Sequence, residues 1–247
     1  PEHEVLEDVA LAQRRFPDTR RVCLADGNAL ILSTERLAAI LDALLAGFPL
    51  LRRVGIYANA RDIRAKSDAD LDQLRQRKLE IVYLGLESGS DEVLRRVHKQ
   101  ATAADMIEAV HKLKRAGIRS SVIALLGLGG VELSAEHAEQ TGRVVSAMDP
   151  EYLSMLTLML VPGTELERQC RCGAFALPGP EGMLQELRRV IAHLEGLSRC
   201  IFRTNHASNY LPLAGTLSRD RASLLAAIDE ALAQGPSAFR PEAWRAL

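Results

Sequence analysis

The sequence has few aromatic residues, almost no net charge and no long hydrophobic run. Phe, Trp and Tyr make up 4% of the 247 residues, too few for a platform that stacks nucleic-acid bases. Thirty-one Lys and Arg residues are balanced by 32 Asp and Glu residues, whereas proteins that hold nucleic acids through phosphates usually show a basic excess. No apolar run approaches the roughly 20 residues of a membrane span, and no signal peptide opens the chain. We therefore expect neither a nucleic-acid partner nor a membrane.

Cysteine is scarce, and its spacing argues against a metal site within the chain. Of the four cysteines, only Cys170 and Cys172 are close in sequence, and their C-x-C spacing is not a common zinc or redox pattern. Cys23 lies in an apolar run and is expected to be a small buried hydrophobe. We expect all four thiols, Cys200 included, to be reduced and unliganded in a cytoplasmic protein.

The remaining composition, 47% hydrophobic and 26% charged, is typical of a globular protein with a sizeable core. Short apolar runs alternate with helical stretches at roughly the 30-residue spacing of a strand–helix unit. The runs are continuous, as in parallel strands that are covered on both faces. The expected strands are residues 22–25, 54–57, 81–84, 121–126 and 152–161.

Capping patterns mark the helices between these strands. After about residue 170 the alternation stops, with an irregular polar segment over residues 201–213 and a final amphipathic helix over residues 222–233. We therefore predict a partial parallel α/β barrel over residues 1–170 and a mostly helical C-terminal extension over residues 171–247. The expected N-terminal caps are Ser33 or Thr34, Ser67 with Asp70, Thr102 with Asp105, and Ser134, and Gly117 is expected to end the helix that Thr102 starts.

Ligands of parallel α/β folds bind in the loops that follow the carboxyl ends of the strands. The five loops here contain carboxylates, amides and glycines, which suit a polar small molecule that needs directed hydrogen bonds. Turn formation explains any one loop at least as well, but the five together favour a rim that binds a ligand. The loops are residues 25–29, 58–62, 85–90, 126–130 and 161–164.

The third loop and its strand carry a resemblance to a known family. Residues 82–89 read Val-Tyr-Leu-Gly-Leu-Glu-Ser-Gly and are followed by Asp91 and Lys99. This run resembles the fourth-strand region of radical S-adenosylmethionine (SAM) enzymes, and residues 112–118 and 122–129 fit the same pattern. The closest likeness is to the branch with oxygen-independent coproporphyrinogen oxidase-like and methylthiotransferase-like proteins. The resemblance implies a (βα)6-type TIM-like partial barrel with SAM across the strand ends.

The resemblance also implies roles for individual residues. Residues 26–28 stand at the motif that holds the methionyl amine, and Glu87 stands at the position that binds the ribose hydroxyls. Leu126 and Gly127 stand at the glycine motif on the adenine, with residues 158–161 on its other side. Lys99 and Lys114 are candidates for the methionyl carboxylate or are solvated helix charges. The predicted cofactor-binding residues are Asp26, Gly27, Asn28, Glu87, Ser88, Lys99, Leu126, Gly127 and Met159.

One element of the family is missing from the sequence. Radical SAM enzymes bind a [4Fe-4S] cluster through a C-x-x-x-C-x-x-C loop after the first strand, and these 247 residues contain no such triplet. Cys170 and Cys172 have the wrong spacing and supply only two thiols. The chain begins with Pro1, and we expect the cluster cysteines upstream of it. The resemblance then implies that the intact protein forms a 5′-deoxyadenosyl radical with SAM, a [4Fe-4S] cluster and an electron donor such as flavodoxin or ferredoxin.

The predicted substrate contacts are Asn59, Arg61, Asn205 and His206. The substrate itself is either a small molecule or of unknown class. The polar segment over residues 202–210 either closes the barrel mouth or is a hydrogen-bonded loop that holds the C-terminal helices. Glu87 has a structural alternative as the cap of a helix that starts near Ser90.

Three other functions remain as alternatives. The protein can be a non-enzymatic descendant of the family that lost the cluster. A doubly wound nucleotide-binding protein would use the glycines of residues 127–130, but Glu132 stands where the third glycine is needed. A lyase with a Schiff-base lysine is disfavoured because no lysine lies at an expected strand end.

Overall fold

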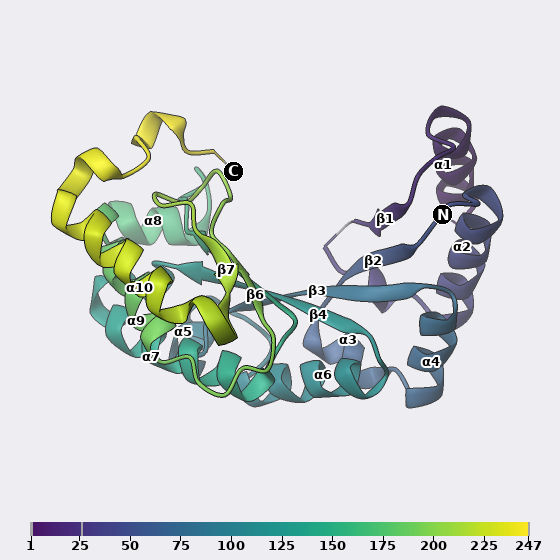
Figure 1. The fold of residues 1–247 in the computed structure, drawn as a ribbon, viewed down its shortest axis with the longest axis horizontal. Helices are drawn as coiled ribbons and strands as arrows, with labels where there is room; N and C mark the ends of the chain where they lie inside the picture. Colours follow the sequence, from purple (N-terminus) through teal and green to yellow (C-terminus); the bar gives the residue numbers. More distant parts are fainter. Residues whose placement is uncertain (1, 26, 247) are drawn as a thin grey trace. The chain divides into compact units, whose positions relative to one another are not determined.

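In the computed structural model of the protein, the described residues form one sheet of seven strands in chain order, from β1 to β7 (Figure 1). The structure describes residues 2–25 and 27–246. The pairs β1–β2, β2–β3 and β5–β6 are parallel, and β6–β7 is antiparallel. This mostly parallel sheet with intervening helices confirms the predicted α/β class. The strands are β1 (Arg21–Leu24), β2 (Arg53–Ala58), β3 (Leu79–Glu87), β4 (Arg119–Leu126), β5 (Tyr152–Thr157), β6 (Ile201–Arg203) and β7 (Ala214–Thr216).

Helices follow the strands in the order expected of strand–helix units. The α-helices are α1 (Glu2–Arg15), α2 (Thr34–Gly47), α3 (Ala60–Ala65), α4 (Asp68–Gln76), α5 (Asp91–Arg96), α6 (Ala103–Arg115), α7 (Gly130–Met148), α8 (Glu165–Arg171), α9 (Pro180–Ala192) and α10 (Leu217–Gln234). The part of the chain that the structure describes also contains the short 3₁₀ helices η1 (Ala29–Ile31), η2 (Gly235–Ala238) and η3 (Glu242–Trp244).

Most of the predicted caps are confirmed. Ser33 accepts from the Arg36 amide at 3.3 Å at the start of α2, and Ser67 and Asp70 form a reciprocal capping box at the start of α4. The predicted cap at Ser134 is wrong. Helix α7 begins four residues earlier, with Gly129 as its N-cap, and Ser134 lies inside the helix.

Packing divides the chain into two units. The first unit contains Pro1–Gly85 and Glu108–Ser121, and the second contains Leu86–Ile107 and Val122–Leu247. The domain boundary predicted at residue 170 stays a prediction. Residues on both sides of that position belong to the second unit, where α9 packs against α7.

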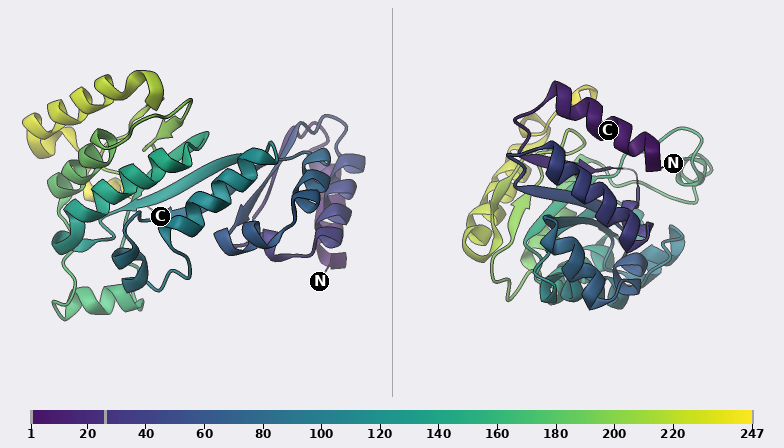
Figure 2. Two further views of the ribbon diagram at one scale, coloured as in Figure 1. Left: turned by 90° about the horizontal axis from the view of Figure 1, so that it is seen from below. Right: turned by 90° about the vertical axis from the view of Figure 1, so that its right-hand side faces the viewer.

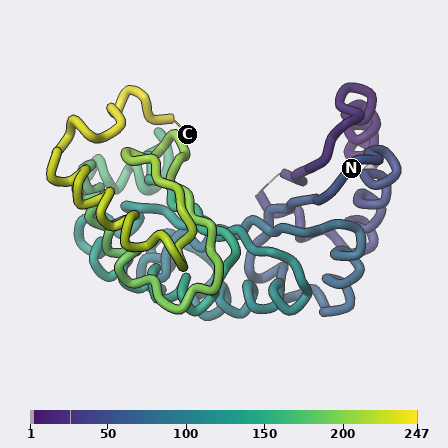
Figure 3. Tube along the Cα trace, viewed as in Figure 1, coloured from purple at the N-terminus to yellow at the C-terminus, as the bar shows by residue number. Residues whose placement is uncertain are grey.

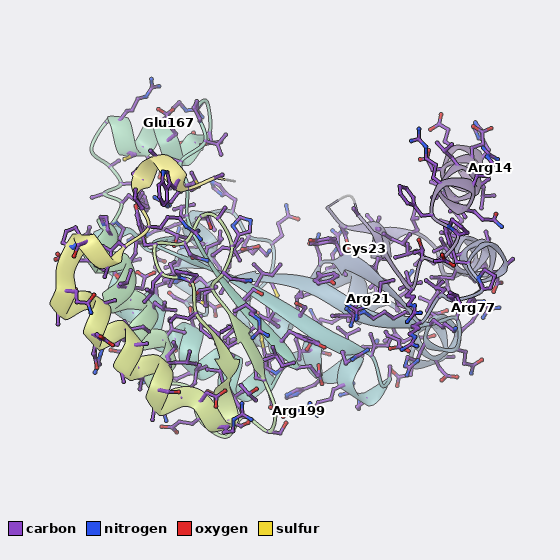
Figure 4. All side chains as sticks on the ribbon, turned by 45° about the horizontal axis from the view of Figure 1, so that its top comes forward. Arg14, Arg21, Cys23, Arg77, Glu167 and Arg199 are labelled. Carbon is purple, nitrogen blue, oxygen red and sulfur yellow. The ribbon has the colours of Figure 1, made fainter. Side chains whose placement is uncertain are left out.

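In the first unit, α1 packs along α2, as the chain trace in Figure 3 shows. Strand β1 pairs with β2 and, among the described residues, with no other strand, so its residues are exposed or half-buried. The expectation of a buried first strand is therefore wrong. Cys23, labelled in Figure 4, is exposed on this edge strand rather than buried.

In the second unit, α7, α9 and α10 pack in succession, and the left view in Figure 2 shows α10 beside α9. The C-terminal part is less purely helical than predicted. Strand β6 begins the segment predicted to be irregular and pairs with β5, and β7 then pairs with β6. Strand β5 ends at Thr157, four residues before the predicted end.

Candidate functional site

Two residues predicted to bind SAM form an ion pair at the end of β3. Lys99 Nζ lies 3.1 Å from Glu87 Oε1, and the two side chains are 23% and 25% exposed. Glu87 has φ +62°, a conformation that is uncommon for a residue with a side chain and that occurs mainly at turns and functional sites. The N-cap of α5 is Ser90, which accepts from the Val93 amide. Glu87 therefore does not cap that helix, and its carboxylate remains partly open to solvent.

The loop after Glu87 is attached to helix α7 by three successive residues. Ser88 is fully buried, and its hydroxyl has its hydrogen-bond partners inside the protein. A role of Ser88 in binding ribose stays a prediction. To take that role, the Ser88 hydroxyl would have to give up one of these hydrogen bonds. The three contacts are Ser88 Oγ with His137 Nδ1 (2.7 Å), the Gly89 amide with Thr141 Oγ1 (2.9 Å), and Ser90 Oγ with Glu136 Oε1 (2.7 Å).

The hydrogen bonds around His137 define one neutral tautomer. The Leu125 carbonyl can only accept, so Nε2, which lies 2.9 Å from it, carries the proton of the neutral ring. Nδ1 then accepts from the Ser88 hydroxyl, whose oxygen accepts from the Ser90 amide at 3.0 Å. Burial lowers the pKa of His137 to about 4, against a smaller opposing effect of the Leu125 carbonyl. A neutral imidazole thus joins the loop after β3 to strand β4.

Gly89 is required by the close approach of this loop to α7. A Cβ atom at Gly89 would lie 2.4 Å from the backbone carbon and oxygen of Gln140. Backbone atoms cannot move aside as a flexible side chain can. The glycine therefore permits packing against a helix rather than a close approach to a ligand.

The turn at the end of β4 contains a contact that the sequence analysis missed. Gly127 has φ +85°, and its amide donates to Glu186 Oε1 at 2.5 Å. Ser134 donates to the other carboxylate oxygen at 2.5 Å. The Glu186 side chain is fully buried, and burial raises its pKa to about 7 despite the two hydrogen bonds.

The end of β4 also lies beside the residues that follow β5. The Leu158 amide donates to the Leu126 carbonyl at 2.9 Å. Leu126 is 2% exposed, and Gly127 is buried beneath Met183, whereas Met159 is half-buried. Three of the predicted adenine contacts therefore lie together, and Met159 is the most accessible of them.

In the first unit, the Asn28 side chain joins the ends of β1 and β2. Asn28 Nδ2 donates to Asp62 Oδ2 at 2.6 Å, and Asn28 Oδ1 accepts from the Asn59 amide at 3.1 Å. Asn59 and Arg61 are exposed, and the Arg61 guanidinium lies 3.6 Å from Asp62. Asp62, which the sequence analysis did not single out, thus organises this cluster. Asp26 lies outside the described residues, and Gly27 beside it is exposed.

A pocket of the first unit lies between α1, β1, η1 and α2. Its volume is about 580 Å³, and its walls are mostly apolar. The lining includes two polar residues, Asp8 and Asn28. Cys23 of β1 also contributes to it. The pocket therefore borders the Asn28 cluster.

The polar segment over residues 202–210 is hydrogen-bonded to the end of β5. Asn209 is buried, accepts from Thr157 Oγ1 at 2.9 Å and donates to the Met155 carbonyl at 2.9 Å. Asn205 and His206 are exposed, and His206 Nδ1 lies 3.0 Å from Ser208 Oγ. The segment is thus a fastened loop, while its two predicted substrate residues still face solvent.

The end of the chain covers this loop. The Arg245 guanidinium lies 4.1 Å from the centre of the Tyr210 ring and donates to the Ser208 carbonyl at 2.7 Å. Its side chain is only 3% exposed. Residues near the C-terminus therefore stabilise the loop that carries Asn205 and His206.

Within residues 2–25 and 27–246, no three His, Cys, Asp or Glu side chains lie close enough together to hold a metal ion. Cys170 lies in α8, and Cys172 ends that helix as a free thiol. An iron–sulfur cluster that needs three thiolates does not fit these residues. The described helices also include none that is both long and apolar enough for a membrane span.

The mostly parallel sheet, with its polar and charged residues at the carboxyl ends of β1 to β4, defines an α/β protein with a ligand site of the strand-end type. Residues 1–140 match the sequence profile of the radical SAM superfamily. The chain belongs to that superfamily. No curated protein sequence matches it.

Solved structures of other proteins share the fold. Archaeal Elp3 from Methanocaldococcus infernus, with residues 1–46 deleted, is 15% identical, and the match covers 93% of this chain and 58% of that one with a TM-score of 0.63. Coproporphyrinogen III oxidase HemN from Escherichia coli, a radical SAM enzyme, is 17% identical over 76% and 43% of the two chains, with a TM-score of 0.60. The methyltransferase TsrM from Kitasatospora setae is 19% identical over 72% and 36%, with a TM-score of 0.53. The chain thus spans about a third to three fifths of the length of these proteins.

Proposed function

We propose that this chain is the SAM-binding core of a radical SAM enzyme. The observation that carries the proposal is the pair of Glu87 and Lys99 at the end of β3. Both side chains are partly exposed, so both can exchange their mutual contact for a ligand. SAM offers ribose hydroxyls to the carboxylate and a carboxylate to the ammonium group. The acidic side chain can accept hydrogen bonds from the ribose hydroxyls, and the basic side chain can donate to the carboxylate of SAM.

The other proposed contacts follow from the accessibility of each residue. Met159 is half-buried beside the end of β4 and is the proposed apolar contact of the adenine. Leu126 and Gly127 support it through the backbone, because Leu126 accepts from the residue before Met159. Asn28 and Gly27 keep their proposed role at the methionyl amine. That role competes with the hydrogen bonds that Asn28 makes to Asp62 and Asn59.

In radical SAM enzymes the cluster and SAM supply the radical chemistry, and the protein supplies binding, orientation and protection from water. The 247 residues contain no C-x-x-x-C-x-x-C motif, so we assign no step of that chemistry to them. We propose that the cluster ligands lie in a part of the protein outside these residues. The proposed partners are a small-molecule substrate and an electron donor such as flavodoxin or ferredoxin, and the proposed compartment is the cytoplasm.

Calorimetric titration with SAM tests the proposed ligand. We expect saturable binding of one SAM per chain, weaker binding of S-adenosylhomocysteine and no comparable binding of ATP, which has no methionyl group. Absence of saturable SAM binding, or equal binding of ATP, would refute the proposal.

A non-enzymatic descendant of the family is the second candidate, and the lack of a thiolate triplet in this sequence favours it. The two candidates differ in the rest of the protein. A C-x-x-x-C-x-x-C triplet elsewhere in the protein supports the enzyme. A protein without such a triplet that still binds SAM supports the descendant.

A further inference from the structure

The buried carboxylate of Glu186 lies outside the region that matches the superfamily, yet it contacts the end of a central strand. Glu186 is on α9, after the matching residues 1–140. Its Oε1 accepts from the amide of Gly127, the first residue after β4. This places a group with a pKa of about 7 directly on a strand-end turn.

Helix α9 and the segment before it hold the turn at several points. The turn is closed by a hydrogen bond of 3.0 Å from the Gly130 amide to the Gly127 carbonyl. The next amide, of Val131, donates to the Ala176 carbonyl at 2.8 Å. Met183, one turn before Glu186 on α9, fills the space beside Gly127, where a Cβ atom would lie 2.3 Å from its terminal methyl. The conformation of the turn is therefore set by residues near α9.

The same turn is linked to Met159. Gly127 follows Leu126, whose carbonyl accepts from the Leu158 amide, and Met159 is the next residue. A shift of the Gly127 amide would therefore move both backbone segments that we propose to lie at the adenine. We propose that Glu186 is a positioning residue that holds the Gly127 turn in the conformation that receives SAM. This inference rests on the proposed function.

The polar and charged groups around Glu186 determine how its protonation affects the hydrogen bond to the Gly127 amide. From α7 it faces the Ser134 hydroxyl and the His137 ring, whose Nε2 lies 3.5 Å away and belongs to a neutral imidazole at pH 7. From the end of β4 it faces the Gly127 amide. On its own helix, Arg189 extends toward Glu139 at 3.8 Å. A carboxylate accepts a stronger hydrogen bond than a neutral carboxyl group, so loss of the proton tightens the hold on Gly127.

The first measurement tests the contact itself. In the ¹⁵N-labelled 247-residue chain, we expect the Gly127 amide proton to shift downfield as the pH rises, with a midpoint near pH 7. Glu186→Gln should abolish this titration, and Glu181→Gln, an exposed position on the same helix, should leave it intact. A Gly127 amide that does not titrate in the wild-type chain, or that titrates equally in Glu186→Gln, overturns the inference.

The second measurement tests positioning toward SAM. Glu186→Ala removes a hydrogen bond to a charged group and should weaken SAM binding about tenfold, with a smaller loss for Glu186→Gln, which keeps one acceptor. Wild-type affinity should rise several-fold from pH 6 to pH 8, and this rise should vanish in Glu186→Gln. A purely structural Glu186 would lower the melting temperature without changing this pH profile, which would overturn the inference. If Glu186→Ala does not fold, the Gln variant and the pH profile decide.

The two proposals can fail separately. Saturable SAM binding that is unaffected in both Glu186 variants overturns the positioning role and leaves the proposed function standing. A titrating Gly127 amide in a chain that does not bind SAM overturns the proposed function and, with it, the role of Glu186 toward SAM.

Discussion

Lys99 Nζ lies 3.1 Å from Glu87 Oε1, and both residues belong to the set predicted to bind SAM. They are 12 positions apart, at the end of β3 and after α5. Without a ligand each charge partly neutralises the other at a site that is about one quarter exposed. Such a partly exposed pair contributes little to stability, so the two charges are better candidates for binding a ligand than for holding the fold.

Glu87→Ala should weaken SAM binding about ten- to a hundredfold, because a charge-assisted hydrogen bond to a ribose hydroxyl contributes roughly 1.5–3 kcal/mol when buried by the ligand. Glu87→Gln should lose less, since it keeps one acceptor. Calorimetry measures both affinities, and Glu132→Gln, an exposed acid paired with Arg96, serves as the control. Unchanged affinity with a lowered melting temperature would assign Glu87 a structural role.

Gly89→Ala should destabilise the fold by about 2 kcal/mol or more, since a methyl group has no space against the backbone of α7. The melting temperature should fall by several degrees, as followed by circular dichroism. Gly179→Ala is the matched control, because nothing lies within 4 Å of the Cβ position there. Equal melting temperatures for the two variants would contradict the close packing at Gly89.

The buried pair His137 and Glu186 should affect stability in opposite pH ranges. Because the pKa of folded His137 is lowered from 6.5 to about 4, the unfolded chain binds a proton that the folded chain does not. Its contribution to the free energy of unfolding is thus lost as the pH falls from 6.5 toward 4. The pKa of folded Glu186 is raised from 4.5 to about 7, so its contribution is present below pH 4.5 and lost as the pH rises through 7.

Urea unfolding at several pH values measures the free energy of unfolding of the wild type and of variants at each of the two positions. The difference between wild type and variant gives the contribution of that side chain. The difference between wild type and His137→Gln should shrink toward pH 4, with a slope of at most about 1.4 kcal/mol per pH unit. The difference between wild type and Glu186→Gln should shrink from pH 4.5 to pH 7. Differences that are flat with pH would mean that neither pKa is shifted by burial.

Residues 1–247 should stay free of iron after anaerobic treatment with iron and sulfide. The described residues bring no three metal-binding side chains together, and Cys200 is buried with a pKa raised to about 12 by desolvation and by nearby Asp149 and Glu151. Iron analysis and electron paramagnetic resonance measure the outcome. A stoichiometric [4Fe-4S] signal would contradict the absence of a cluster site.

Features fixed by neighbours in the sequence could be predicted. Ser67 and Asp70 are three residues apart, so their capping box depends on one turn of chain and was found where expected. The place of Glu87 at the end of β3 could be predicted because a strong strand pattern precedes it, whereas its role stays a prediction. The edge position of β1 could not be predicted, because an apolar run does not show how many neighbouring strands it pairs with. For that reason Cys23 is exposed rather than buried.

Features that depend on distant residues were missed. Glu186 meets Gly127 across 59 positions, and Ser134 turns toward that carboxylate instead of capping α7. One indication existed in the sequence. Glu186 lies on the same face of α9 as the buried Met183 and Val190, three residues after one and four before the other. The three-residue strands β6 and β7 are too short to show a periodic pattern.

The central claim is tested most directly by product formation from SAM. The whole protein, including the segment that carries the proposed cluster cysteines, would be reconstituted anaerobically with iron and sulfide and then given dithionite and SAM. The account predicts 5′-deoxyadenosine in amounts well above a control in which those cysteines are replaced by alanine, and a reduced yield in Glu87→Ala. A reconstituted protein that binds its cluster yet forms no more 5′-deoxyadenosine than the cluster-free control would contradict it.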